Sequence, residues 1–188
     1  MRVHAIGLPN LGKFAVKSAR MEKVRILGVD TSLRSSGVAV IEARGQQFRA
    51  LVYGRIHNKP ALPHSACLAE IHRQIDSLIT EFEPDEAAIE GAFFAKNAKT
   101  AMILGQARGS VLACCSLRTL PVYEYSPRSV KQAVVGVGAA RKEQVAKMVM
   151  RLLGLKEQPQ EDAADALAIA LTHAHQRGLP EALRSKAV

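Results

Sequence analysis

Four carboxylate residues stand where apolar runs of the sequence begin or end. Asp30 ends the run VRILGVD, and Glu90 ends a second run, AAIE. Asp162 and Asp165 lie at the start of a predicted helix, EDAADALAIALTHAH, over 161–175. Residues three apart share one face of a helix, with roughly 5–6 Å between their Cβ atoms, so the two aspartates can point to one spot. The pattern is typical of an acidic cluster assembled from separate elements.

Such a cluster has a definite chemistry. Partly buried carboxylates repel one another unless cations neutralise them or some members stay protonated. Clusters of oxygen ligands suit Mg²⁺ or Mn²⁺, and two such ions about 3.5–4 Å apart can hold both reacting oxygens of a phosphodiester. Each carboxylate also has a structural explanation: Asp30 can begin a turn, and Glu161 and Asp162 can stabilise a helix start.

The composition indicates which classes of binding partner the protein favours. The chain has 188 residues with 26 Lys and Arg against 17 Asp and Glu, a net charge of +9, which favours nucleic acid first and an anionic membrane surface second. A basic protein without a polyanionic partner stays an alternative. No apolar run approaches 18 residues, so we expect no membrane span. The cysteines have no CxxC spacing, and we expect free buried thiols, typical of a reducing compartment, at Cys67, Cys114 and Cys115.

The periodicity of the chain predicts a single α/β domain with three strands first and helices and strands in alternation afterwards. A basic extension over 1–22 precedes this domain, which covers 23–177, and a tail over 178–188 follows it. If the first and fourth strands are neighbours, Asp30 and Glu90 lie side by side at an edge where α/β sheets bind ligands. The expected strands are 24–30, 38–44, 48–56, 86–91 and 120–126. The expected helices are 65–82, 97–117, a short one from Pro127 with Ser126 as its N-cap, 142–153 and 161–175.

Three long stretches carry a resemblance to a known family. They are AIEGAFFAKNAKTAMILGQARG (88–109), VYEYSPRSVKQAVVGVGAARKEQV (122–145) and QEDAADALAIALTHAH (160–175). From about Val24 to His175 the chain resembles RuvC, the bacterial Holliday-junction resolvases. The resemblance implies an RNase H-like α/β fold: a mixed five-stranded sheet with helices on both faces.

The resemblance also implies the activity and its partners. The family is a group of homodimeric endonucleases that nick two strands of a four-way DNA junction symmetrically, in recombination and repair. It implies two Mg²⁺ ions per active site, which Mn²⁺ can replace, a RuvA–RuvB branch-migration complex as partner, and action in the bacterial cytoplasm. The small residues of the helix 97–117 would permit close helix contact, so this helix is the candidate dimer surface.

The site residues follow from the same motifs. Phe93 matches an aromatic residue that wedges or stacks at the junction, although core packing also explains it. Lys131 and Lys142 match basic residues that contact DNA near the scissile phosphate, although each also suits a solvated surface. The matched metal-binding and catalytic residues are Asp30, Glu90, Asp162 and Asp165.

The sequence departs from the family in two places. Where the family commonly has D-P-G-S/T-R-x-x-G, this chain has DTSLRSSG: Arg34 and Gly37 keep their places and the Pro-Gly pair is absent. Residues 1–20 are basic and free of acid, which fits a dispensable extension, a DNA-contacting tail or an organelle transit peptide. We expect Glu161 to be an ordinary acid at a helix start.

Two other functions are alternatives. RILGVDTS also resembles the first strand of the actin/Hsp70 superfamily, including its scaffold subunit for tRNA modification. That alternative leaves AIEGAFFAKN and DAADALA unexplained. The altered loop after Asp30 also permits a junction-binding protein with impaired catalysis. We expect His173 and His175 to be surface or packing residues, because they lie roughly 16–20 Å along the helix from Asp162.

Overall fold

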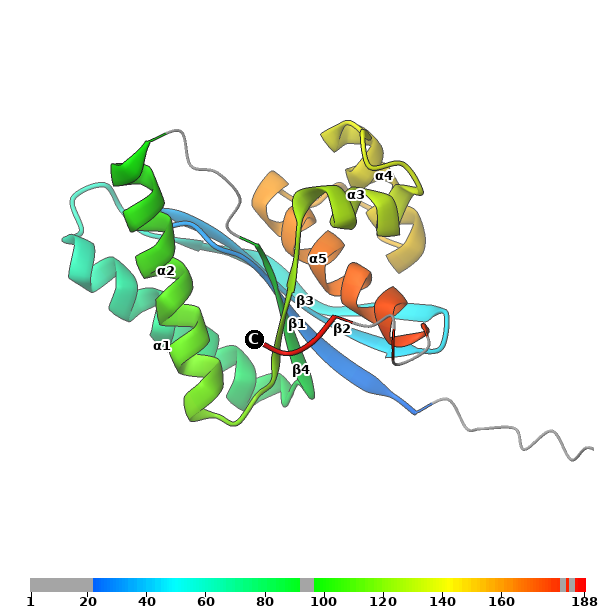
Figure 1. Ribbon diagram of the computed structural model, residues 1–188, viewed down its shortest axis with the longest axis horizontal. Coiled ribbons are helices and arrows are strands. Elements are labelled where there is room, and N and C mark those ends of the chain that lie inside the picture. Colours follow the sequence, from blue (N-terminus) through cyan, green and yellow to red (C-terminus); the bar gives the residue numbers. More distant parts are fainter. Residues whose placement is uncertain (1–21, 92–96, 180–181, 183–184) are drawn as a thin grey trace, which may run out of the picture.

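The computed structural model describes residues 22–91, 97–179, 182 and 185–188. Its centre is one five-stranded sheet in the order β3-β2-β1-β4-β5 (Figure 1). The strands β1, β2 and β3 form an antiparallel meander, whereas β4 is parallel to β1, and β5 is parallel to β4. The strands are β1 (Val24–Asp30), β2 (Ser35–Arg44), β3 (Gln47–His57), β4 (Glu86–Glu90) and β5 (Val122–Tyr125).

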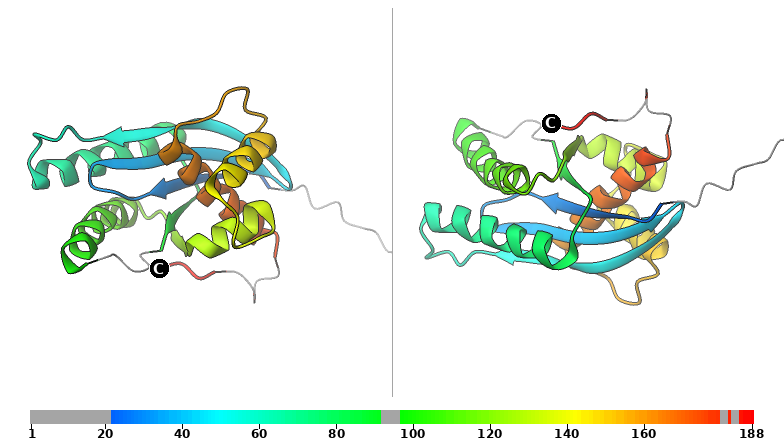
Figure 2. Two further views of the ribbon diagram at one scale, coloured as in Figure 1. Left: turned by 90° about the horizontal axis from the view of Figure 1, so that it is seen from above. Right: turned by 90° about the horizontal axis from the view of Figure 1, so that it is seen from below.

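Helices cover both faces of this sheet. Figures 1 and 2 show α1 and α2 together on one side, and α3, α4 and α5 on the other. Successive side chains of a strand point to opposite faces, so Ile26 packs against α5 while Leu27 packs against α1 and α2. The expected mixed five-stranded sheet with helices on both faces is confirmed. The helices are α1 (His64–Phe82), α2 (Ala98–Leu117), α3 (Pro127–Val135), α4 (Lys142–Leu153) and α5 (Glu161–Arg177).

Most element boundaries agree with the sequence patterns, whereas the second and fifth strands differ from them. The second strand begins at Ser35, three residues before the expected start, because Ser35 pairs with His57 of β3. The fifth strand is shorter than expected and begins at Val122, after Pro121. Ser126 caps α3 as expected, since its hydroxyl accepts from the Ser129 amide at 3.0 Å.

The segment after α5 returns to the sheet. Ala187 forms a bridge with Tyr123, and the Val188 amide donates to the Val122 carbonyl at 2.9 Å. This contact covers part of the outer edge of β5, which an unpaired strand would otherwise expose. The cysteine prediction is confirmed, since Cys67, Cys114 and Cys115 are buried free thiols. Within the described ranges, no helix has the length and apolar character needed to cross a membrane.

Candidate active site at the carboxyl ends of two parallel strands

The first two carboxylates end neighbouring parallel strands. In the register of β1 and β4, Val29 lies opposite Ile89, so Asp30 and Glu90 follow at the same edge of the sheet. Val29 and Ile89 are fully buried, which fixes the two strands against the α1 and α2 layer. The expected neighbourhood of Asp30 and Glu90 is therefore present in the fold.

Two glycines let α5 lie directly on the sheet. A Cβ atom added to Gly28 would meet the Ala166 carbonyl oxygen at 2.3 Å, and one added to Gly37 would meet the Asp162 carbonyl oxygen at 1.9 Å. No side chain fits at either point, so the backbone of α5 touches β1 and β2. Ala166 and Ala170 on the contacting face are fully buried. This close approach carries the acidic start of α5 to the edge where β1 and β4 end.

Three of the four predicted carboxylates share one pocket with both predicted lysines. We call it the carboxylate pocket; its volume is about 260 Å³. The sheet contributes Asp30 and Glu90, and α5 contributes Asp165. Its polar lining residues are Asp30, Glu90, Asp165, Lys131 and Lys142, and its apolar walls are Pro127, Val130, Val145 and Ile169.

The fourth carboxylate, Asp162, does not line this pocket. Its Oδ2 atom accepts a hydrogen bond from the Ser35 hydroxyl at the start of β2. It lies near enough to the others to repel them, because its charge contributes to the raised pKa of both Asp30 and Asp165. Asp162 is therefore adjacent to the cluster and is held by a partner that the sequence patterns did not indicate.

Burial and mutual repulsion make the cluster costly to ionise. Burial, followed by the negative charges of Glu90, Asp165 and Asp162, raises the pKa of Asp30 from 3.8 to about 7. Burial is also the largest cause that raises the pKa of Glu90 and of Asp165. A divalent cation would relieve this repulsion, so the donor set fits Mg²⁺ or Mn²⁺.

The side chains do not form a closed metal cage. Among residues 22–91, 97–179, 182 and 185–188, no group of three or more His, Cys, Asp or Glu side chains is arranged to hold a metal ion. The positively charged side chain of Lys142 lies at the edge of the cluster: its Nζ atom is 3.6 Å from Asp165 Oδ2 and 2.5 Å from Glu161 Oε1. Glu161 is thus the ion-pair partner of Lys142 and more than a helix-start acid.

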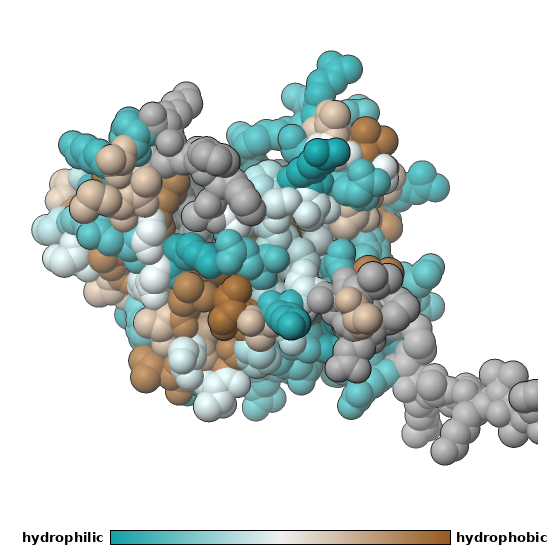
Figure 3. Space-filling model, viewed as in Figure 1, coloured by the Kyte–Doolittle hydropathy of each residue, from teal (hydrophilic) through white to brown (hydrophobic). Residues whose placement is uncertain are grey.

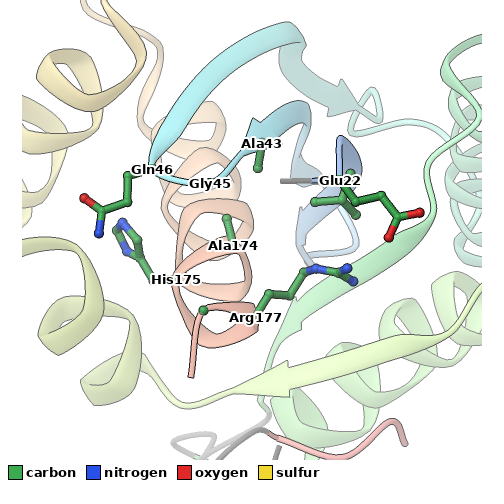
Figure 4. Close-up of a pocket in the computed structure, with 9 residues that line it drawn as sticks. Glu22, Ala43, Gly45, Gln46, Ala174, His175 and Arg177 are labelled. Atoms are coloured by element: carbon green, nitrogen blue, oxygen red, sulfur yellow. The ribbon is translucent and has the colours of Figure 1, made fainter. Parts of the chain in front are cut away.

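A second cavity, of about 220 Å³, adjoins the carboxylate pocket: Lys142 and Asp165 line both, and Glu161 lines the second. A further cavity lies at the other end of the sheet. Figure 4 shows a pocket of about 360 Å³ where α5 ends and β1 begins, with His175 and Arg177 among its lining residues. This is the end of β1 opposite Asp30. His175 packs edge-on against Phe48 with ring centroids 5.1 Å apart, and His173 is buried. His175 is a packing residue, as the sequence indicated. His173 is buried as expected, and both its ring nitrogens are also hydrogen-bonded: Nδ1 is 2.6 Å from the Tyr125 hydroxyl and Nε2 is 2.6 Å from Glu86 Oε2.

Two predictions fall outside the described part of the chain. Phe93 lies in the segment 92–96, and the basic extension predicted over 1–22 lies outside the described residues apart from Glu22. The residues that sequence reasoning missed are Ser35 as a partner of Asp162, Glu161 as a partner of Lys142, and Gly28 as a contact point of α5. Gly37, the other contact point of α5, did have a signal in the sequence, since it keeps its place in the loop motif after Asp30.

Comparisons with known proteins agree with this geometry. The family model described as crossover junction endodeoxyribonuclease RuvC matches residues 26–173. RuvC of Idiomarina loihiensis is 51% identical over 154 residues, covering 80% of this chain and 86% of the relative. RuvC of Caldicellulosiruptor saccharolyticus is 43% identical, covering 80% and 92%.

Solved structures give the same answer. The structure of T. thermophilus RuvC in complex with Holliday junction substrate has a TM-score of 0.82 and 35% identity, covering 88% of this chain and 99% of that one. The yeast mitochondrial resolvase Ydc2, at 13% identity and a TM-score of 0.59, shares the fold.

These matches exclude one of the two alternative functions that the sequence left open. The family model spans AIEGAFFAKN and DAADALA, which the actin/Hsp70 alternative leaves unexplained, so that alternative is wrong. RuvC nucleases depend on a divalent metal, in keeping with the acidic cluster. The chain belongs to the RuvC family of crossover junction endodeoxyribonucleases.

Proposed function

We propose that this protein resolves four-way DNA junctions by paired, symmetric nicks, in recombination and repair in the bacterial cytoplasm. The observation that carries this proposal is the carboxylate pocket, where three partly buried acids and two lysines meet on a chain of net charge +9. A metal-dependent nuclease needs this charge distribution: carboxylates at the centre bind the metal ions, and basic side chains around them bind the DNA backbone.

We assign the carboxylates to a divalent-metal site. Asp30, Glu90 and Asp165 would hold two Mg²⁺ ions, or Mn²⁺ in their place, with Asp162 completing the set from its position beside the pocket. When bound, two such ions supply a hydroxide nucleophile and neutralise the leaving 3′-oxygen. The part of this chain is to keep four acids close together at the end of a rigid sheet.

The lysines bind and orient the substrate phosphate in this proposal. Lys131 and Lys142 line the same pocket as the acids, so both ammonium groups stand where a scissile phosphate would enter. An ammonium group at that point holds the backbone and stabilises the charge that develops in the transition state. Phe93, which precedes α2, would stack on an unpaired base at the junction centre.

We further propose that α2 pairs with the α2 of a second copy. Five small or apolar residues along its outer face are exposed, and a Cβ added to Gly105 or Gly109 would meet nothing within 4 Å. Met102, on the same face, is 66% exposed. Figure 3 shows apolar residues along the part of the surface that α2 forms. The exposed small and apolar residues of this face are Ala101, Met102, Gly105, Gly109 and Ala113.

The dimer matters because symmetric nicking needs two active sites. Gly109→Glu would raise the helix propensity of α2 while placing a charge at the close contact. We expect this variant to be a folded monomer by light scattering, and to lose the paired nicks. A dimeric Gly109→Glu protein would contradict the assignment of α2. The RuvA–RuvB complex is the partner that the family suggests for the assembled dimer.

The central experiment uses a synthetic four-way junction with Mg²⁺. We expect Asp30→Asn, Glu90→Gln and Asp165→Asn each to lower cleavage by at least about 10²-fold, with junction binding retained. Asp162→Asn should behave likewise. Glu157→Gln, which removes an exposed acid from the loop before α5, is the matched control and should cleave normally.

The same assay tests the remaining alternative. A wild-type protein that binds the junction and leaves it uncut would be a junction-binding protein with impaired catalysis. Near-normal turnover of any one of the four carboxylate variants would remove that residue from the proposed metal site.

A further inference from the structure

A serine of β2 contacts an acid of α5 that is 127 residues away in the sequence. The Ser35 hydroxyl donates a hydrogen bond to Asp162 Oδ2. Ser35 is the first residue of β2, and Asp162 lies in the first turn of α5. The contact therefore joins the loop after β1 to the helix that brings two of the four acids. Ser35 lies within DTSLRSSG, at a position that the family pattern D-P-G-S/T-R-x-x-G leaves unspecified.

The backbone on the Ser35 side is fixed from several directions. Ser35 pairs with His57 in the ladder between β2 and β3. The preceding residue, Arg34, donates from Nη1 to the Lys59 carbonyl at 2.8 Å, and its own carbonyl accepts from the Asn58 amide at 2.9 Å. The hydroxyl is thus presented from an ordered strand end, and it can impose a position on its partner.

The packing of α5 on β2 positions Asp162 against Ser35. Ser35 and Gly37 are two apart on a strand, so both point to the face that α5 covers. Gly37 leaves room for the Asp162 backbone, and Ser35 reaches the side chain of the same residue. Ser36 points to the opposite face, where its hydroxyl accepts from the Ser32 amide at 3.0 Å. Backbone and side chain of Asp162 are therefore both set by β2.

The chemistry of a carboxylate makes such a contact consequential. The hydroxyl engages one oxygen of Asp162 and leaves Oδ1 for another ligand. A neutral donor orients the carboxylate without cancelling its charge, so the acid keeps its attraction for a cation. Groups that orient metal-binding carboxylates in this way typically contribute about 10–100-fold to metal affinity.

We propose that Ser35 is a positioning residue, whose hydroxyl holds the Asp162 carboxylate in the orientation from which it joins the divalent-ion site. The inference rests on the proposed function, because it takes Asp162 to be a metal ligand.

The test compares Ser35→Ala with Ser35→Thr in the full chain without DNA. Titration with Mn²⁺, followed by the electron paramagnetic resonance signal of the free ion, measures affinity independently of cleavage. We expect Ser35→Ala to weaken Mn²⁺ binding by about tenfold or more. Ser35→Thr keeps a hydroxyl on a residue type that strands favour, so it should bind Mn²⁺ as the wild type does.

A double-mutant cycle shows whether Ser35 acts through Asp162. In an Asp162→Asn background, Ser35→Ala should cause no further loss of Mn²⁺ affinity. An equal loss in both backgrounds, or failure of Ser35→Thr to restore binding, would mean a general structural effect and would overturn the inference.

The remaining outcomes separate this inference from the proposed function. Wild-type Mn²⁺ affinity in Ser35→Ala, with reduced affinity in Asp162→Asn, would overturn the role of Ser35 alone. Unchanged Mn²⁺ binding in Asp162→Asn itself would remove Asp162 from the metal site, and the inference would fall with it.

Discussion

Lys142 contacts two acids of α5 at once. Its Nζ atom is 2.5 Å from Oε1 of Glu161 and 3.6 Å from Oδ2 of Asp165. Glu161 has a 70% exposed side chain, whereas Asp165 lines the carboxylate pocket. Lys142 therefore interacts both with a solvated acid and with an acid of the proposed active site. Glu161 competes with any phosphate for the same ammonium group.

This competition gives the first prediction. Glu161→Gln should tighten binding of a four-way junction by about 2–10-fold at 50 mM salt, because it frees Lys142 and removes a negative charge within a Debye length of the DNA. Binding is measured by fluorescence anisotropy with Ca²⁺ in place of Mg²⁺. Glu157→Gln makes the same change of net charge and should have a smaller effect. Equal gains from the two variants would show that Lys142 is not specifically released.

Lys131 supports a second prediction. It lies in the carboxylate pocket, where burial raises the pKa of Glu90 and the positive charge of Lys131 opposes part of that rise. If Lys131 binds a phosphate, Lys131→Ala should reduce the slope of log affinity against log salt by about 0.9. Lys23→Ala is the control: Lys23 pairs with Glu42 just before β1, at the end of the sheet opposite Asp30. An unchanged slope for Lys131→Ala would mean that Lys131 does not contact the DNA backbone.

The sequence was sufficient to predict most of the helices and strands and the four carboxylates that they carry. Apolar runs that end in Asp30 and Glu90, and a spacing of three between Asp162 and Asp165, are local signals that survive in the fold. The sheet order and the family follow from the same long motifs. These features depend on periodicity and motif, both of which one sequence contains.

The partners of the acids have no such signal. Ser35 and Asp162 are 127 residues apart, and Lys142 and Glu161 are 19 apart, so only the tertiary structure brings them together. Ser35 also lay outside the expected second strand, because the polar stretch TSLRSSG reads as a loop. Pairing with His57 in the ladder brings Ser35 into β2.

The close approach of α5 to the sheet gives a third prediction. Gly37→Ala would place a Cβ 1.9 Å from the Asp162 carbonyl oxygen, which is backbone and must move. We expect a loss of about 1–3 kcal/mol in the free energy of unfolding, together with weaker Mn²⁺ binding, because the start of α5 is displaced. Urea denaturation and Mn²⁺ titration measure the two effects.

A second glycine provides the matched control for this substitution. Gly54 lies on β3, and a Cβ there would meet nothing within 4 Å. Gly54→Ala should change the free energy of unfolding by less than about 0.5 kcal/mol and leave Mn²⁺ binding unaltered. If Gly37→Ala were as mild as Gly54→Ala, α5 would not depend on contact with the backbone of β2.

The raised pKa of Asp30 gives the last prediction, which concerns the stability of the protein without metal. Its pKa is raised from 3.8 to about 7, so between these pH values the folded state binds a proton that the unfolded state has released. The stability that this proton supplies is complete below pH 4 and is lost as pH rises through 7. Asp30→Asn cannot ionise and should unfold at a higher temperature than the wild type at pH 8.

The expected gain is about 1–3 kcal/mol, since one pKa unit corresponds to about 1.4 kcal/mol and the neighbouring acids titrate together with Asp30. For a chain of this length that is roughly 2–10 °C in Tm at pH 8 with EDTA, and near zero at pH 4. Saturating Mn²⁺ should reverse the order, because metal binding to the folded state stabilises the wild type and not Asp30→Asn. Calorimetry at both pH values, with and without Mn²⁺, measures all four cases. If Asp30→Asn is less stable than the wild type at pH 8 in EDTA, the carboxylate is stabilised by contacts beyond those described, and repulsion within the cluster is not what a metal relieves.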